Sequence, residues 1–506
     1  MFILQTAHSR LRHSFGPLST SMNSPNGGIS LSTVSTSVSS NNPNFPTTVL
    51  QRIFGLLIQG PVVFPLPTED GRRILAQVCR RWREVVTSGS AYWGSFIFVP
   101  LVVQPPQSLF QLAQAFLRRS GETIPLSVRF LGLLQSDVAR SMFELVIRSY
   151  GHRLSFLSCV VTRREFGTFF GADDVHFPLL EHIDIQVRNT DGYISTRFPA
   201  KGSIDLSRFK RAPSLRHVVL RILVGVHPGD LRLSWGRLTR IDLGNTPTRP
   251  RRFMKIMEQS FALEHGVFCI NFAPSSNGQS PIFQIITVPL LRRLRLRLTQ
   301  PSHDVDIFRQ LRMPSLEEIW LEREEVGQSI RDMDLYETLL SRLDAPLKHV
   351  TIGEHSLPMT TWFLPRLHLS PRLVYQQLDG VFRSAPNLTS LYLCPGLFMD
   401  LLVLEHLASG ELLPLLEKLG VSSVSGWDIV WMVKGRNLAS TRPESSNSLV
   451  ASMAPPVALN YLDLFVMGGL GESGERELPD ALRALRLSCG FGFKYADVFW
   501  RESSTS

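Results

Sequence analysis

The stretch LEHIDI at residues 180–185 decides the fold, because its pattern returns along most of the chain. The pattern is Leu-x-x-φ-x-φ, in which φ is an apolar residue. It occurs eleven times, at residues 154–159, 180–185, 215–220, 238–243, 291–296, 316–321, 347–352, 388–393, 416–421, 459–464 and 482–487. The alternation φ-x-φ predicts a short strand with one buried face, and the leucine three residues earlier predicts a buried turn that leads into it.

A single unit of this kind cannot bury its apolar side alone, so successive units are expected to stack. Apolar residues at helical spacing fill the intervals and predict helices at residues 108–119, 138–150, 253–263, 333–343, 398–408 and 427–435. Strands would then lie on one side and helices on the other. The pattern resembles that of leucine-rich-repeat proteins, which implies an α/β fold with an irregular leucine-rich-repeat solenoid over residues 100–495.

The intervals between the anchor leucines depart from a regular repeat. They range from 23 to 53 residues, whereas regular repeats of this class run about 20–29 residues. The longest interval, from Leu238 to Leu291, is expected to hold a further repeat with a strand at residues 267–272. Residues 437–456 are rich in Ser and Pro and predict a mobile insert. The expected arc is therefore irregular.

Residues 44–99 precede the repeats and predict a small helical module. Apolar residues from Phe45 to Leu57 recur on one helical face, and a Gly-Pro pair at residues 60–61 ends that helix. Residues 60–71 are expected to form a loop. A second, continuous helix is predicted from residue 72 to Gly89, with Cys79 buried in its apolar stripe and Arg72 pointing away from the stripe.

This module resembles an F-box, of the divergent type common in fungal proteins. The resemblance is carried by Phe45-Pro46, Ile53-Phe54, Val78-Cys79-x-x-Trp82-Arg83 and Tyr92-Trp93. Two features depart from the family: Phe45 replaces its first leucine, and the central loop is long.

In that family the module binds a Skp-type adaptor of a cullin ubiquitin ligase. The resemblance therefore implies an adaptor-binding surface made by Phe45, Pro46, Leu50, Ile53, Phe54, Val78 and Trp82. Two short helices cannot hide all of these apolar side chains between them. The alternative is that these residues pack inward against the repeats that follow.

Residues between the φ positions are expected to point out of the strand face, because strand side chains alternate. Among them, Trp320, Tyr392 and Tyr461 are predicted to anchor a protein target, since interfaces favour exposed aromatic side chains. Arg293, Arg295 and Arg297 are predicted to form a local positive stripe that contributes to the same target-binding surface.

Composition narrows the class of partner. The chain has 506 residues, which suits more than one folded unit, and 43% of them are hydrophobic. Its net charge of +10 would suit an acidic partner, but the basic residues are scattered, so no nucleic-acid partner is expected. The five cysteines form no C-x-x-C pair, and no apolar stretch reaches the ~18 residues of a membrane span.

The first 43 residues contain no acidic residue and are rich in Ser, Thr and Asn, which predicts a disordered tail. A mitochondrial presequence is the alternative that this composition leaves open. If residues 1–43 are a disordered tail, the protein is expected in the cytoplasm or the nucleus.

The sequence offers no support for catalysis. A Gly-x-Gly-x-x-Gly stretch at residues 469–474 follows a predicted strand, but Pro479 and nearby glutamates disfavour a phosphate site. We expect no catalytic residue, metal or cofactor. The expected function is a non-catalytic substrate-recognition adaptor of a Skp–cullin–F-box ubiquitin ligase, whose repeat arc binds a protein target. The alternative is a stand-alone repeat scaffold in which the F-box-like segment is only an N-terminal cap.

Overall fold

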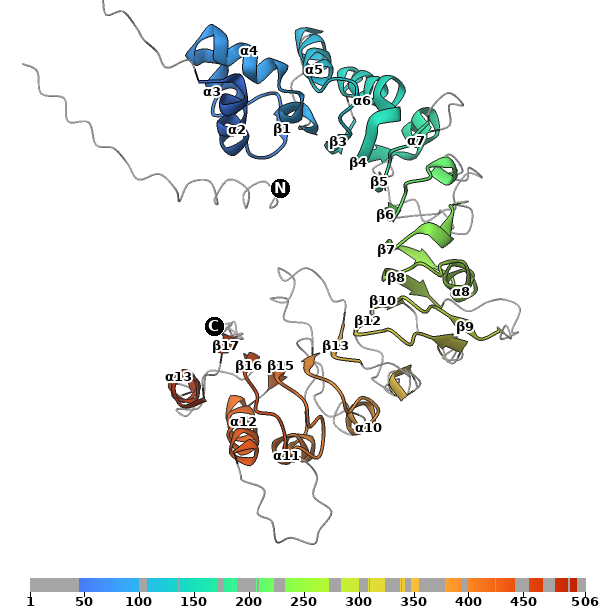
Figure 1. The fold of residues 1–506 in the computed structure, drawn as a ribbon. Helices are drawn as coiled ribbons and strands as arrows, with labels where there is room; N and C mark the ends of the chain where they lie inside the picture. Colours follow the sequence, from blue (N-terminus) through green and yellow to red (C-terminus); the bar gives the residue numbers. More distant parts are fainter. Residues whose placement is uncertain are drawn as a thin grey trace, which may run out of the picture. The chain divides into compact units, whose positions relative to one another are not determined.

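The fold was analysed in a computed structural model of the chain (Figure 1). It describes residues 45–99, 107–134, 136–170, 176–188, 206, 209–222, 233–272, 284–299, 308, 310–323, 337, 339–341, 347–354, 378–393, 399–423, 425–441, 455–466, 478–489 and 492–497. The predicted tail at residues 1–43 and most of the helix predicted at 333–343 lie outside these residues. The fold is mixed α/β and is built on one parallel sheet.

Within the described residues, a 15-stranded sheet joins its strands in the order in which they occur in the sequence. Every neighbouring pair is parallel. Its strands are β1 (Val62–Phe64), β2 (Ser95–Phe98), β3 (Leu126–Leu133), β4 (Leu154–Thr162), β5 (His182–Arg188), β6 (His217–Ile222), β7 (Arg240–Thr248), β8 (His265–Asn271), β10 (Arg293–Thr299), β12 (Glu318–Arg323), β13 (His349–Glu354), β14 (Ser390–Leu393), β15 (Lys418–Ser423), β16 (Tyr461–Val466) and β17 (Gly492–Asp497). A separate 2-stranded sheet pairs β9 (Ile286–Thr287) with β11 (Leu311–Arg312).

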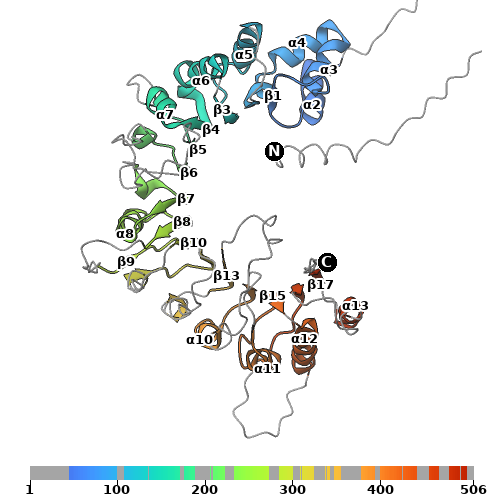
Figure 2. The same ribbon diagram turned by 180° about the vertical axis from the view of Figure 1, so that it is seen from behind.

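Helices fill many of the crossovers that parallel strands require. They are α2 (Thr47–Leu57), α3 (Gly71–Val78), α4 (Arg80–Ser88), α5 (Gln107–Arg119), α6 (Asp137–Tyr150), α7 (Arg163–Phe170), α8 (Pro250–Gln259), α10 (Leu378–Arg383), α11 (Leu401–Ser409), α12 (Gly426–Ser440) and α13 (Leu478–Cys489). Short 3-10 turns are η1 (Ser90–Trp93), η2 (Gly151–Arg153), η3 (Phe209–Arg211) and η5 (Trp235–Arg237). Two opposite views place helices α5 to α8 on the same side of the neighbouring strands (Figures 1 and 2).

Local sequence explains where several helices begin. The Ser136 side chain accepts a hydrogen bond from the backbone N–H of Ala139 and caps α6. Asp400 caps α11 in the same way through Val403, and Gly410 ends that helix with a φ of 81°, a conformation that suits glycine. Pro250 occupies the first turn of α8, where its missing N–H costs nothing.

The repeated pattern accounts for most of the sheet. Ten of its eleven matches run into strands of the sheet, and their leading leucines are all buried. In β5, for example, Ile183 and Ile185 are buried, while the alternating residues His182 and Asp184 are half-buried on the opposite face. The strand predicted at residues 267–272 is also present, as β8. These strand predictions are confirmed.

The eleventh match, at residues 482–487, is wrong as a strand. It lies in α13, where Leu478 and Leu482 are both buried and are spaced by one helical turn. Leucines three residues apart fit a helix face as well as a turn into a strand, so the pattern alone does not separate the two. The strand of this repeat is β17, which follows the helix.

The N-terminal module also differs from its predicted form. The expected loop at residues 60–71 contains β1, whose Val62 and Phe64 are buried and which pairs with β2 as the first strand of the sheet. The expected continuous helix is interrupted at Cys79, which is extended and exposed. The Cys79 sulfur accepts a hydrogen bond from the N–H of Trp82 at 3.4 Å, so the residue caps α4 instead of continuing α3.

Arg72 was expected to point away from the core, but it is buried. Its guanidinium donates hydrogen bonds to the carbonyls of Tyr92 and Gly60 and forms an ion pair of 2.9 Å with Asp70. Burial lowers the Arg72 pKa, and Asp70 opposes that effect. Arg72 thus links Gly60, just before β1, to Tyr92, just before β2. These bonds and the ion pair with Asp70 compensate the cost of burying its charge.

A second buried arginine organises the C-terminal repeats. Arg436 of α12 donates five hydrogen bonds to backbone carbonyls, at 2.8 to 3.3 Å, and they belong to Leu407, Leu413, Pro414, Leu416 and Val457. Its neighbour Asn437 bonds both the N–H and the carbonyl of Leu459. The mobile insert predicted from residue 437 therefore begins too early, because α12 continues to Ser440. Residues 442–454 lie outside the described part of the chain.

Candidate protein-binding surfaces

The inner face of the N-terminal module is packed. Leu50 and Phe54 of α2 are buried, and the Phe54 ring meets Trp82 of α4 edge to face, with 5.0 Å between ring centroids. Trp93 is also buried, and its indole N–H donates a hydrogen bond of 2.9 Å to the Val86 carbonyl. Leu50 and Phe54 are therefore core residues, and neither offers a surface to a partner.

The outer faces of α2 and α3 are apolar and exposed. On α2, Ile53 is 39% exposed and Leu57 58% exposed, with Leu56 beside them. On α3, Ile74 is 51% and Val78 55% exposed, one helical turn apart. We call these five residues the outer apolar surface. Exposed apolar side chains gathered on two short helices are typical of a protein-binding site.

Helices α2 and α3, which carry the outer apolar surface, approach each other at the end of α2. Gly71, the first residue of α3, lies so close to the end of α2 that a β-carbon there would come 3.3 Å from the Leu57 carbonyl oxygen. Glycine permits this approach, which brings the start of α3 to the end of α2. The end of α2 that carries Leu57 and the start of α3 therefore lie close together.

The predicted adaptor-binding residues are buried, exposed or half-buried, and the prediction is wrong for the buried ones, Leu50 and Phe54. Ile53 and Val78 belong to the outer apolar surface, and Phe45 and Pro46 are also exposed. Trp82 is half-buried. The sequence interpretation missed Leu56 and Leu57 and did not include Ile74, although a second stripe at spacings of three and four along α2 could have indicated the first two.

The three predicted arginines of the strand face are exposed or half-buried on β10, but their charge is largely offset by β12. Arg293 forms an ion pair of 3.1 Å with Glu318, and Arg295 bonds the carboxylate of Glu322. Arg297 lies 4.0 Å from the same carboxylate. Register explains the pairing, because Arg293 lies opposite Glu318 and Arg297 opposite Glu322. The expected positive stripe is thus a mixed row of both charges.

Trp320 lies at the centre of that mixed row. It is 37% exposed, its indole N–H donates a 2.9 Å hydrogen bond to Glu318, and the Arg295 guanidinium sits 4.8 Å from the ring centroid. These contacts hold the ring in place while leaving part of it accessible. Trp320 therefore has the setting of an interface anchor.

The two predicted tyrosines are less accessible than Trp320. Tyr392 is half-buried, and its ring occupies the space that a side chain at Gly420 on the next strand would need. Tyr461 is half-buried on β16. Tyr392 and Trp320 lie on the same row of the sheet with Thr351 between them, whereas Tyr461 lies on the neighbouring row.

A row of rings crosses the other half of the strand face. Phe156, His182 and His217 lie in register on β4, β5 and β6, with 4.6 Å and 5.4 Å between successive ring centroids. Burial, together with smaller contributions from His217 and Arg240, lowers the pKa of His182 to about 4. Burial and Arg240 also lower the pKa of His217. These imidazoles are neutral near pH 7 and form an uncharged aromatic strip.

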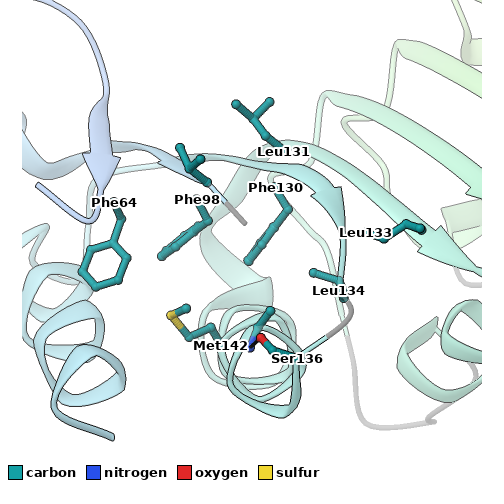
Figure 3. A pocket seen from close by; sticks show the side chains of 10 residues that line it. Phe64, Phe98, Phe130, Leu131, Leu133, Leu134, Ser136 and Met142 are labelled. Carbon is teal, nitrogen blue, oxygen red and sulfur yellow. Dashed lines mark hydrogen bonds between the residues drawn. The ribbon is translucent and has the colours of Figure 1, made fainter. Parts of the chain in front are cut away.

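The cavity between the first strands and α6 is too small for a substrate. It has a volume of about 30 Å³ and is lined by apolar residues including Phe98, Phe130 and Met142 (Figure 3). A space of that size holds roughly one water molecule. It is a packing gap in the core and not a ligand site.

Among the described residues, no group of three or more His, Cys, Asp or Glu side chains could hold a metal ion. The same residues contain no helix that is long and apolar enough to cross a membrane. Comparison of the sequence with known protein families and with curated proteins found no match to either.

Proposed function

We propose that this chain is a non-catalytic adaptor of a Skp–cullin–F-box ubiquitin ligase, acting in the cytoplasm or the nucleus. Residues 45–95 would form the F-box-like module and the parallel strands an irregular leucine-rich-repeat solenoid. The outer apolar surface would bind the Skp-type adaptor, and the strand face around Trp320 would bind a protein target.

The observation that carries the proposal is that α2 has two apolar faces, one buried in the module and one exposed. Leu50 and Phe54 bury one face of α2, whereas Ile53 and Leu57 leave the other face apolar and exposed. An exposed apolar face on a helix that already has a packed core is costly in water unless a partner covers it. The F-box resemblance supplies a partner that binds such a face.

One observation favours the rival function of a stand-alone scaffold. β1 lies inside the F-box-like segment and pairs with β2, which pairs in turn with β3. This segment therefore contributes the first two strands of the sheet, as a capping repeat would. Capping explains β1 and β2 but leaves the outer apolar surface without a role.

Co-purification with a Skp-type adaptor separates the two functions. We expect the full chain to retain the adaptor, and Ile53→Asp or Val78→Asp to lose it, since a charge in an apolar interface costs several kcal/mol. Leu50→Asp is unsuitable, because Leu50 is buried and the change would unfold the module. The binding assay should use purified, folded variants.

Leu290→Asp is a matched control, because Leu290 is also about half exposed but precedes β10, far along the sheet from the module. It should retain adaptor binding. Undiminished capture of the adaptor by Ile53→Asp and Val78→Asp would refute docking through this surface. A wild-type chain that never captures the adaptor would favour the scaffold.

A further inference from the structure

A pocket lined by arginines lies between α3, α4, η1 and α5. It has a volume of about 260 Å³, and its basic lining residues are Arg72, Arg73, Arg83 and Arg119. Gln77 and Thr87 add polar groups, and Trp93 and Phe116 add aromatic ones. None of the described residues that line it carries a carboxylate. Four guanidinium groups around one small pocket are an unusual concentration of charge in a chain whose basic residues are otherwise scattered.

Arg119 is the lining arginine whose positive charge is contacted by aromatic rings and not by a carboxylate. Its guanidinium lies 5.1 Å from the Trp93 ring centroid and 5.2 Å from that of Phe116, so two aromatic rings hold it in place. It is half-buried, and burial lowers its pKa. A partly buried cation that faces rings instead of a carboxylate gains free energy when an anion binds beside it.

Of the nearby acidic groups that the structure describes, Asp70 offsets the charge of one lining arginine, Arg72, and the others leave Arg73, Arg83 and Arg119 without an ion pair. Asp70 pairs with Arg72 at 2.9 Å, and Glu84 pairs with Arg80 at 2.9 Å. Glu69 is fully exposed, and its pKa is lowered mainly by a hydrogen bond from Thr68, with only a small contribution from Arg73. Arg83 also lines the pocket, and it uses its Nε to bond the Ala76 carbonyl, which leaves the two terminal nitrogens of its guanidinium as further donors.

We propose that this pocket binds a small, multiply charged phosphate compound. Arg73, Arg83 and Arg119 would donate charge-assisted hydrogen bonds to its oxygens, because guanidinium groups match phosphate geometry with paired N–H donors. Gln77 and Thr87 are the neutral polar groups beside them. The volume is below the ~300–1,000 Å³ typical of pockets for drug-sized ligands, which suits a compact anion.

The phosphate site is separate from the outer apolar surface. On α3, Arg73 and Gln77 are one helical turn apart on the pocket side, whereas Ile74 and Val78 are one turn apart on a face rotated from it by about 100°. One helix can therefore contact a phosphate compound and a protein partner at once. The proposed pocket does not depend on the identity of that partner.

Calorimetric titration of the full chain with inorganic pyrophosphate tests the site. We expect binding that weakens as salt is added, and Arg119→Gln and Arg73→Gln should each raise the Kd about tenfold or more, as expected for a lost hydrogen bond between charged groups. Arg73 is exposed, so its change should leave the fold intact even if Arg119→Gln loosens the packing around Trp93. Arg118→Gln is the matched control, because Arg118 is adjacent but lies outside this pocket.

The source of the phosphate group can be assigned in a second arm. Stronger binding to phosphatidylcholine vesicles that contain phosphatidylinositol bisphosphate than to plain vesicles would identify a lipid headgroup, and equal binding would identify a soluble compound. Both results retain the site if Arg119→Gln abolishes the phosphate-dependent signal. The proposal is overturned if the wild-type chain binds neither probe, or if Arg118→Gln weakens binding as much as Arg119→Gln.

Discussion

Replacing Arg436 by methionine should unfold the C-terminal repeats locally. Methionine keeps an unbranched apolar stem but removes all five hydrogen bonds to backbone carbonyls. The carbonyls of Leu413 and Pro414 each keep a backbone N–H donor, from Leu416 and Val457. A buried carbonyl that is left without a partner costs about 1–3 kcal/mol. Water entry and small backbone shifts will recover part of that sum, so we expect a loss of about 3–5 kcal/mol, the range seen when a buried charged network is broken.

Hydrogen exchange followed by mass spectrometry measures the effect and its location. The five carbonyls belong to the end of α11, the turn that leads to β15 and the segment before β16, so protection should fall in those elements. The strands β4 to β8 should keep theirs, because stacked repeats contact mainly their neighbours. Lys434→Met is the control, since Lys434 is exposed on the same helix. The reasoning fails if Arg436→Met loses no more protection than Lys434→Met.

Two further predictions concern the strand face. Leu321→Ala should cost about 2–5 kcal/mol because Leu321 is fully buried, whereas Trp320→Ala should cost about 1 kcal/mol or less; chemical denaturation checks the contrast, and equal losses would contradict the assigned faces. His182 has a folded pKa of about 4, below its usual ~6.5, so protonation favours the unfolded chain. Its contribution to stability is therefore intact above pH ~6.5 and is lost as the pH falls toward 4. Thermal unfolding across that pH range should show a smaller acid-induced loss for His182→Gln, and identical pH profiles would exclude His182 as the cause.

The sequence predicts the strands better than it predicts the surfaces. Leu-x-x-φ-x-φ states both which residues alternate and which face is buried, so Ile183, Leu321 and Leu391 could be assigned inward correctly. Strand side chains alternate between two faces, so only two assignments are possible, and the face with the apolar residues is the buried one. Helix α2 has no such constraint, because Leu50 and Ile53 are equally apolar and only the packed module shows that Leu50 faces inward.

Charge was harder to predict than apolar burial. The partners of Arg293 and Arg295 lie on β12, more than twenty residues later, and only the strand register shows that they face each other. Buried arginines were missed for a related reason. Nothing near Arg436 in the sequence indicates that five carbonyls from distant turns converge on it, and the pocket around Arg119 depends on the same kind of convergence.

The order of the strands has a consequence for how the chain acquires its structure. Each described strand of the large sheet pairs with the strands that precede and follow it in that sheet, and the sheet keeps the order of the sequence. A repeat can therefore dock as soon as it has been synthesised, without waiting for residues made much later. Each docking step closes a chain segment of about one repeat, which keeps its entropic cost moderate. The module that carries the outer apolar surface comes first in that order. It can be complete on the ribosome while most of the sheet that will extend from it has still to be translated.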